Sequence, residues 1–245
     1  MRDLDRYEAD YIATYGFERH MVRYRRRQIR ECLAWYPHRN ILEVGCGLEP
    51  LFLHLDEWAS YTVVEPGRQF AERARQLAPL ERNVDVHCVR IEDAAAALDG
   101  KTFDFIILSS LLHEVADPTG LLAAVRNLCT GGTLVHINVP NARSLHNRIA
   151  VKMGLIPDVF AQSLLAERMQ RRSTYDLVTL EELTTRSGFH TQSFGSYFLK
   201  PFTSQQLQSM LDQGIITEQV LDALFDVNSD FDGLGSEIYL NVTMR

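Results

Sequence analysis

The sequence predicts an α/β protein built on a doubly wound, mostly parallel, seven-stranded sheet. Short runs rich in β-branched and aromatic residues alternate with stretches of helix-forming composition, a pattern typical of a parallel sheet with helices on both faces. The first run ends in a turn bracketed by Gly45 and Gly47, which lets backbone approach the carboxyl edge of the sheet. With 245 residues, 46% of them hydrophobic and 23% charged, the chain is expected to form a single domain over residues 1–245.

A helical cover is expected ahead of the sheet, over residues 1–36. The tetrapeptide PHRN at 37–40 then breaks the helical pattern. Inside the cover, the basic run RYRRRQIR at 23–30 alternates with Tyr24 and Ile29 at helical spacing. We expect its arginines to form the solvated face of an amphipathic helix, with contact to a phosphate or carboxylate as the alternative.

Five strands and the helices between them are expected within residues 37–140. The strand-like runs are NILEVG at 40–45, YTVVEP at 61–66, VDVHCVRI at 84–91, FDFIILSS at 103–110 and TLVHINVP at 133–140. Helical stretches cover 68–78 and 118–128. Asp117 and Pro118 predict the N-cap and first residue of the second helix, and Gly131 and Gly132 stop it before the next strand.

Residues 141–175 interrupt this alternation with helical material, which we expect to form a lid over the carboxyl edge of the sheet. Residues 176–245 are expected to complete the sheet. Thr179 and Glu182 fit a capping box at the start of a helix. The runs at 190–199 and 236–244 predict the last two strands.

Composition and charge narrow the classes of partner. A net charge of −7, with no extended basic stripe outside residues 23–30, opposes nucleic acid as a partner. No stretch approaches the roughly 18 consecutive apolar residues of a membrane span, and MRDLDRYEAD at the start is unlike a signal or transit peptide. We therefore expect a cytoplasmic protein with no membrane partner. The four cysteines, which lack CxxC spacing, predict buried thiols without a metal site or disulfides: Cys32, Cys46, Cys88 and Cys129.

Acidic residues gather at the same edge of the sheet as the glycine turn. Glu65 ends the second strand 18 residues after Gly47, near the distance at which an acidic residue reaches a ribose diol. Pro50 in place of a third glycine, and Glu49 beside it, oppose a pyrophosphate at this turn. Glu43 is expected to face, directly or through water, the ammonium group of an amino acid that carries a sulfonium charge of its own.

The run ILEVGCGLEP at 41–50 resembles motif I of the class I S-adenosylmethionine-dependent methyltransferases. The likeness extends through Glu65, RIEDA at 90–94 and FDFIILSSLLHEVADP at 103–118, and it is strong over residues 40–140. GLEP lacks the common third small residue, so the start of the first helix is expected to be unusual. The resemblance implies a Rossmann-like fold with S-adenosylmethionine as methyl donor and S-adenosylhomocysteine as product.

The resemblance also implies ten cofactor-binding positions: Glu43, Gly45, Cys46, Gly47, Glu65, Pro66, Glu92, Asp93, Ser109 and Ser110. The residues from Glu43 to Gly47 would surround the methionine moiety, and Glu65 would bind the ribose hydroxyls. Glu92 or Asp93 would receive the adenine amino group, with a solvated turn as the alternative. The two serines would lie beside the sulfonium.

Methyl transfer is an in-line displacement in which the protein aligns a nucleophile and excludes water, and a base is needed only where the nucleophile must lose a proton early. His113 is the first candidate base because it follows the fourth strand and an imidazole titrates in the useful range; packing beside the cofactor is the alternative. His146 is the second catalytic candidate, with loop capping as the alternative. His136, inside the fifth strand, is expected to be a satisfied core histidine.

Acceptor binding is expected from Asn141, Arg143 and Tyr175. Further polar candidates are Arg148, Arg171, Arg172 and Lys200, each with a solvated or structural role as the alternative. PNARSLHNRIAVKMGLI at 140–156 and FLKPF at 198–202 also resemble methyltransferases that act on small polar acceptors in surface-glycan or natural-product pathways.

The function expected from the sequence is methyl transfer to a small polar acceptor by a monomer or homodimer. A nicotinamide-dependent oxidoreductase shares the strand, glycine turn and distant acid, but Pro50 and Glu49 argue against it. A non-catalytic module that binds S-adenosylmethionine is the other alternative. Methylation of a protein or nucleic acid is a further possibility, and the charge balance opposes the nucleic acid.

Overall fold

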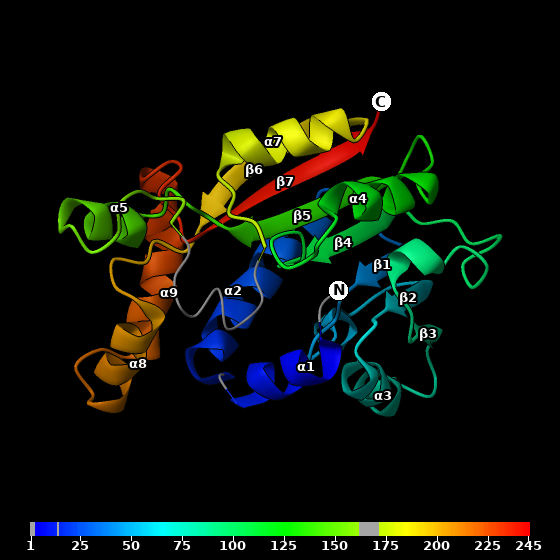
Figure 1. Ribbon diagram of the computed structural model, residues 1–245. Coiled ribbons are helices and arrows are strands. Elements are labelled where there is room, and N and C mark those ends of the chain that lie inside the picture. Colours follow the sequence, from blue (N-terminus) through cyan, green and yellow to red (C-terminus); the bar gives the residue numbers. More distant parts are fainter. Residues whose placement is uncertain (1–2, 14, 162–171) are drawn as a thin grey trace.

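The computed structural model of the protein describes residues 3–13, 15–161 and 172–245. Its helices and strands carry the labels of Figure 1. In chain order they are α1 (Leu4–Ala13), α2 (Tyr15–Leu33), β1 (Asn40–Val44), η1 (Leu51–His54), β2 (Ser60–Val64), α3 (Arg68–Leu77), β3 (Val84–His87), η2 (Ile91–Asp93), β4 (Phe105–Ser109), α4 (Pro118–Asn127), β5 (Leu134–Pro140), α5 (Leu145–Lys152), α7 (Leu177–Arg186), β6 (Phe189–Tyr197), α8 (Ser204–Asp212), α9 (Glu218–Asp226), η3 (Val227–Asp230) and β7 (Glu237–Met244).

The strands form one seven-stranded sheet in the order β3-β2-β1-β4-β5-β7-β6. Strands β1 to β5 pair in parallel, and β7 lies antiparallel between β5 and β6. The chain winds outward in both directions from β1 and β4, and ligands of such sheets bind at the carboxyl ends of the strands beside this switch point. The predicted doubly wound, mostly parallel sheet is confirmed.

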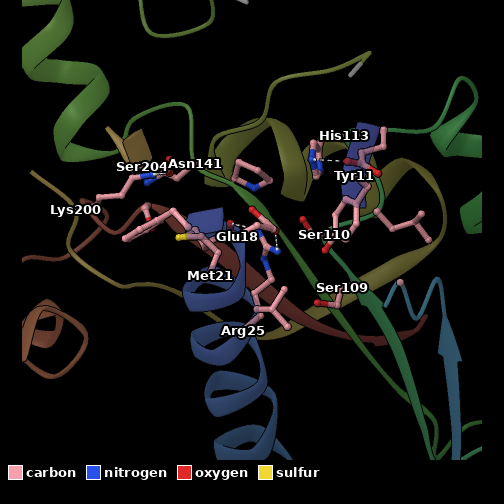
Figure 2. A pocket seen from close by; sticks show the side chains of 18 of the residues that line it. Tyr11, Glu18, Met21, Arg25, Ser109, Ser110, His113, Asn141, Lys200 and Ser204 are labelled. Atoms are coloured by element: carbon pink, nitrogen blue, oxygen red, sulfur yellow. Dashed lines mark hydrogen bonds and ion pairs between the residues drawn. The ribbon is translucent and has the colours of Figure 1, made fainter. Parts of the chain in front are cut away.

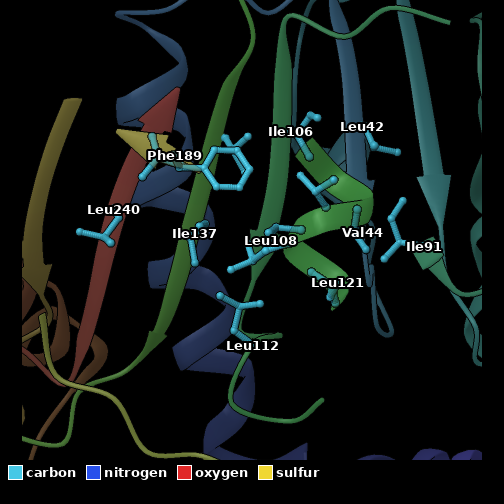
Figure 3. Close-up of a cluster of buried hydrophobic side chains, with 14 of the residues drawn as sticks. Leu42, Val44, Ile91, Ile106, Leu108, Leu112, Leu121, Ile137, Phe189 and Leu240 are labelled. Atoms are coloured by element: carbon cyan, nitrogen blue, oxygen red, sulfur yellow. The ribbon is translucent and has the colours of Figure 1, made fainter. Parts of the chain in front are cut away.

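Two apolar layers hold helices against the sheet. Along β1, Ile41 faces one layer and Leu42 the other, as the period-2 alternation of a strand requires. Helices α4 and α7 cover one face, and α2 and α3 cover the other (Figure 1). Figure 3 shows Leu121 of α4 among Val44 and Leu108 of the sheet. Truncating such a buried leucine to alanine typically costs about 2–5 kcal/mol.

The first crossover of the sheet has no α-helix. After β1 and the glycine turn, the 3₁₀-helix η1 begins at Leu51, directly behind Pro50, and the chain then enters β2. Proline suits a helix start because it has no N–H to leave unsatisfied. The structure is therefore unusual at the position where GLEP departs from the family pattern.

Helix boundaries follow local capping chemistry. Helix α4 begins at Pro118, and the Asp117 side chain accepts a hydrogen bond from Gly120 N, as predicted. The N-cap of helix α7 lies three residues before the predicted N-cap. Asp176 is its N-cap and accepts from Thr179 N at 2.9 Å, so Thr179 is the N3 residue and the assignment of Thr179 as N-cap was wrong.

Helices α8 and α9 were not among the predicted elements. They pack with α2 around a third apolar cluster that includes Tyr24 and Phe198, whose rings stack with centroids 4.4 Å apart. Figure 1 shows α8, α9 and α5 together at one end of the sheet. Their packing extends the wall of the site beyond the helices that the sequence predicted.

The basic run of α2 is not a plain solvated face. Tyr24 and Ile29 are buried as expected, but the arginines between them form ion pairs with acidic residues from distant segments. Arg23 bonds Asp222 of α9 at 2.8 Å, and Arg25 is buried between two carboxylates. Arg23, Arg27 and Arg30 are exposed, as the expected solvated face requires, whereas Arg25 is buried and contacts carboxylates inside the protein.

The described residues also bear on cysteines and membranes. Cys32 and Cys46 are buried as expected, whereas Cys88 is exposed and Cys129 is partly exposed, which corrects the expectation for those two. Within the described segments, no helix has the length and apolarity that a membrane crossing requires.

Candidate active site

The carboxyl edge of the sheet opens into a cavity of about 1120 Å³. Residues at the ends of β1, β2, β4 and β5 line it, together with residues of α1, α2, α5 and α8. In Figure 2, Glu18 and Arg25 of α2 lie between His113 on one side and Lys200 on the other. The cavity therefore joins the glycine turn to a second region built from later parts of the chain.

Gly45 and Gly47 form the turn that the sequence placed after β1. Their φ angles of 79° and 58° lie in the left-handed region, where a side chain would be strained. A Cβ on Gly45 would also lie 3.5 Å from Leu111 Cδ1. Both glycines and the intervening Cys46 line the cavity, so the turn presents backbone to whatever occupies it.

Glu43 lines the cavity, and its carboxylate is bonded within the protein. One oxygen accepts from the Tyr61 hydroxyl at 2.8 Å and from the Leu51 backbone nitrogen at 3.1 Å. Leu51 is the first residue of η1. The first N–H of a helix has no partner within the helix, so Glu43 caps η1 there. Burial raises the pKa of Glu43 to about 7. Its expected role toward a ligand ammonium stays a prediction.

Glu65 bridges two backbone turns. Its Oε1 accepts from Gly67 N at 2.7 Å, and Oε2 accepts from Gly47 N at 3.4 Å. Burial raises the pKa of this carboxyl to about 7. Glu65 and Pro66 both line the cavity beside the glycine turn, where the sequence expected them.

Helix α1 covers this part of the cavity with residues that sequence reasoning missed. The carboxylate of Glu8 is buried and accepts from the backbone nitrogens of Gln69 and Phe70, at 2.9 and 3.3 Å. The rings of Tyr7 and Tyr11 lie 6.3 and 5.8 Å from that of Phe70. The i,i+4 spacing of the tyrosines was the available signal, because it places both rings on one helix face.

Ser109 and Ser110 end β4 in a tight bend at the cavity wall. Ser110 has a φ of 54°, which is uncommon for a residue with a side chain. Asn138 of β5 holds the bend, because its Oδ1 accepts from Ser110 N at 3.0 Å and from Ser109 Oγ at 3.2 Å. Strained backbone held by its surroundings is typical of functional sites.

His113 and Glu114 lie side by side in the cavity wall after β4. The Nε2 atom of His113 is 3.6 Å from Glu114 Oε1, and Glu114 Oε2 accepts from the Tyr7 hydroxyl at 3.0 Å. The side chains of His113 and Glu114 are both buried. This placement fits the two roles expected for His113, a base or a hydrogen-bonding group beside the cofactor.

His146 lines the cavity from α5, near Lys200. Burial, with the positive charge of Lys200, lowers the pKa of His146 to about 3. A neutral imidazole of such low basicity takes up a proton poorly at neutral pH. Lys200 lines the cavity as expected, and its Nζ donates to Ser204 Oγ at 3.1 Å. This low basicity argues against His146 as the base, and its expected catalytic role stays a prediction.

The three predicted acceptor-binding residues do not meet in the cavity. Asn141 lines it, but its amide donates to Gly235 O at 2.8 Å, and its Oδ1 accepts from Arg143 N at 2.9 Å. Arg143 points away to pair with Asp176 at 2.7 Å, and Tyr175 is buried in the apolar core. Neither of the latter lines the cavity. Arg143 and Tyr175 instead connect the end of β5 to the start of α7, so their assignment as acceptor-binding residues is corrected.

Other predicted positions also fall outside the cavity. Glu92 and Asp93 lie on η2, are exposed and do not line it, so the alternative of a solvated turn describes them better than adenine binding. Arg148 and Arg172 are exposed, and Arg171 lies outside the described residues. Further from the site, His136 is buried as expected and bonds Asn241 through Nδ1 at 2.7 Å.

The negative charge of Glu49 is paired with a positive charge on α2. Its carboxylate lies 2.7 Å from Arg26 Nη2, so the negative charge that was expected to repel a phosphate is opposed by an arginine. A stronger argument against a pyrophosphate site is that no α-helix follows the glycine turn, because such a site uses the N-terminus of a helix at this position. Within the described segments, no three His, Cys, Asp or Glu side chains are grouped to hold a metal ion.

Comparison with known proteins agrees with this architecture. Residues 14–193 match a family model described as a methyltransferase domain. A polyketide synthase-nonribosomal peptide synthetase of Phaeosphaeria nodorum is 26% identical over 148 residues, which are 57% of this chain and 4% of that protein. The chain therefore spans about 4% of the length of the curated relatives that it matches.

Solved structures share the fold at low sequence identity. A methyltransferase of Thermotoga maritima, described as a possible histamine N-methyltransferase, has a TM-score of 0.63 at 17% identity, covering 97% of this chain and 95% of that one. The plantazolicin methyltransferase BamL, in complex with S-adenosylhomocysteine, has a TM-score of 0.58 at 15% identity, covering 99% and 97%. The chain belongs to the methyltransferase-domain family, in its class I, S-adenosylmethionine-dependent form.

Proposed function

We propose that the protein transfers a methyl group from S-adenosylmethionine to a small polar acceptor. The observation that carries this proposal is the cavity of about 1120 Å³, which begins at the glycine turn and continues to α5 and α8. Sites for one small ligand typically enclose roughly 300–1000 Å³. A cavity above that range, with a family cofactor site at one end, has room for a donor and an acceptor together.

The residues at the glycine turn fit the cofactor. Gly45 and Gly47 have no Cβ, so a ligand can approach their backbone closely. The hydrogen bond that Glu65 Oε2 accepts from Gly47 N is long, at 3.4 Å, so this oxygen has capacity for a ribose hydroxyl. When bound, S-adenosylmethionine supplies a methyl group on a positively charged sulfur, which already is a good leaving group. Acidic side chains suit that charge.

The remaining chemistry is alignment, exclusion of water and removal of one proton. Tyr7 and Tyr11 of α1 cover the cofactor end, which shields it from water. His113 Nε2, beside Glu114, can hold a proton released by an acceptor hydroxyl or amine.

Two relatives support a natural-product context for the acceptor. One is a polyketide synthase-nonribosomal peptide synthetase, and another is a plantazolicin methyltransferase. Their names refer to the synthesis of polyketides and nonribosomal peptides and to the methylation of plantazolicin. The sequence expectation of a monomer or homodimer adds no constraint on that acceptor.

Calorimetry with purified protein tests the proposal. We expect S-adenosylhomocysteine to bind with a dissociation constant in the micromolar range and NAD⁺ to give no heat. Crystals grown with S-adenosylhomocysteine should place the nucleoside beside Glu65. Binding of NAD⁺ in preference to the homocysteine product, or a nucleoside located away from the glycine turn, would overturn the proposal. Turnover against an acceptor panel distinguishes an enzyme from a module that only binds the cofactor.

A further inference from the structure

Glu237, the first residue of β7, brings a buried carboxylate to the cavity wall. It pairs with Pro140 at the carboxyl end of β5, and both residues line the cavity. Its Oε1 accepts from Arg25 Nη2 at 2.8 Å. Its Oε2 has no hydrogen-bond partner among the residues that the structure describes, although the side chain is only 2% exposed.

An unmatched carboxylate oxygen is costly in such a place. Leaving a buried polar group without a partner typically costs about 1–3 kcal/mol, and more for a charged group. Most buried polar atoms in proteins therefore have a partner, and exceptions at a cavity call for an explanation. A donor on a bound molecule would supply the missing hydrogen bond.

The single positive charge of Arg25 does not cancel the negative charge of the carboxylates around it. It lies between Glu237 and Glu18 and forms an ion pair with each, so one guanidinium faces two carboxylates. Figure 2 shows Arg25 and Glu18 turned toward one another on α2, inside the pocket. The group of three carries a net negative charge at neutral pH, and all three residues line the cavity.

Helix α8 adds a second unmatched acceptor. Gln208 donates through Nε2 to Asp212 Oδ1 at 2.8 Å, which orients the amide. Its Oε1 has no partner within the described part of the chain. Both side chains line the cavity.

The acceptor side of the cavity can be defined as its described lining residues in 18–25, 140–161, 200–212 and 236–237. Three carboxylates stand there against two cations: Glu18, Asp212 and Glu237 against Arg25 and Lys200. The excess is negative, and the unmatched oxygens of Glu237 and Gln208 both accept hydrogen bonds. This chemistry favours a positively charged donor. The excess negative charge repels an anion, and a neutral hydroxyl carries no charge of its own for the carboxylates to attract.

We infer that Glu237 binds a protonated amino group of the methyl acceptor and so selects amines over alcohols and carboxylic acids of the same skeleton. The inference rests on the proposed function, because it names the acceptor class for that site. The role is recognition of charge. If that nitrogen is itself the methyl acceptor, it must first lose a proton, because an ammonium has no lone pair to attack the methyl group. Arg25 positions the carboxylate through its bond to Oε1.

The test uses the full chain saturated with S-adenosylhomocysteine. The probes are two matched sets: 2-phenylethylamine, 2-phenylethanol and 3-phenylpropionate, then hexylamine, 1-hexanol and hexanoate. Dissociation constants are measured by calorimetry for the wild type, for Glu237→Gln, which keeps the size of the side chain, and for Glu18→Gln. The last variant is the matched control, since it removes the same charge from the other partner of Arg25.

We expect the amine of each set to bind the wild type at least about tenfold more tightly than its alcohol or acid, a difference of about 1.4 kcal/mol. Glu237→Gln should lose that preference while its affinity for S-adenosylhomocysteine stays unchanged. Glu18→Gln should lose clearly less of the preference than Glu237→Gln, because it lowers the negative charge of the acceptor side but leaves the unmatched Oε2 of Glu237 in place. Equal or tighter binding of the alcohols or acids, no binding of either amine, or equal losses in both variants would overturn the inference. Failure of S-adenosylhomocysteine to bind the wild type would instead overturn the proposed function.

Discussion

The Oε1 atom of Glu8 in α1 lies 2.9 Å from the backbone nitrogen of Gln69, in the first turn of α3. Glu8 is the buried side chain of α1, so this helix is attached by a polar cap where most helices use an apolar face. Gly67 makes room for the cap, because a Cβ there would lie 2.6 Å from Glu8 Oε1. Glu8 thus adds a buried polar anchor to the contacts that Tyr7 and Tyr11 make with Phe70 and that Tyr7 makes with Glu114.

Glu8→Ala should loosen α1 without unfolding the sheet. Removing a side-chain cap costs about 1 kcal/mol, which corresponds to roughly fivefold more frequent opening. Hydrogen exchange followed by mass spectrometry should show faster exchange of α1 amides, and S-adenosylhomocysteine should dissociate faster. The exposed Asp5 of the same helix provides the control, as Asp5→Ala should change neither rate more than twofold. Unaltered α1 exchange in Glu8→Ala would show that the cap does not hold this helix.

Glu65→Ala should weaken binding of S-adenosylhomocysteine. The substitution removes a carboxylate bonded to both Gly47 and Gly67, and hydrogen bonds to a charged group contribute about 1.5–3 kcal/mol, or roughly 10- to 100-fold in the dissociation constant. Glu92→Ala is the matched control, because Glu92 is exposed outside the cavity. Calorimetry on both variants measures the contrast. If Glu92→Ala proves the more damaging change, the sequence-based adenine assignment was right and the placement argued from the cavity is wrong.

Glu43 should make stability depend on pH. Its pKa is about 7 in the folded chain against an ordinary value of 4.5, so between these values the folded state holds a proton that the unfolded state has released. Its contribution to the free energy of unfolding therefore falls as pH rises from about 4.5 to about 7. In thermal melts, the Tm of Glu43→Gln minus that of the wild type should increase as pH rises from 5 to 8. A difference in Tm that does not change with pH would contradict the raised pKa.

His146 should stay neutral throughout the working pH range. Burial and Lys200 hold its pKa near 3, well below the ordinary value of 6.5. In proton NMR, the imidazole signal that disappears in His146→Asn should keep a constant chemical shift between pH 5 and 8. A midpoint between 5 and 8 for the His146 signal would restore it as a candidate base.

Local pattern was sufficient for the sheet and for the glycine turn. Alternating apolar runs gave the strands, and glycine at Gly45 and Gly47 meets a local need for positive φ that the neighbouring residues do not alter. Glu65 was found for a related reason, since parallel strands end at one edge and its spacing from Gly47 is fixed by a single crossover.

Residues outside those local rules could not be assigned in this way. Arg143 follows β5 and Tyr175 precedes α7, both near the carboxyl edge of the sheet. The side chain of Arg143 nevertheless turns outward to Asp176, and that of Tyr175 enters the apolar core. A sequence gives the order of such residues along a loop, but the direction of each side chain depends on which neighbour satisfies it.

The amino-acid sequence by itself determined the order of the strands, the backbone turn at their carboxyl edge and the family to which the chain belongs. The tertiary structure alone decided which charges share the cavity. Arg25 and Glu237 are 212 positions apart and meet only because α2 packs against the sheet beside β7. The cost of burying a charge depends on distances in space, so the pairing that defines the acceptor side follows from the packed fold.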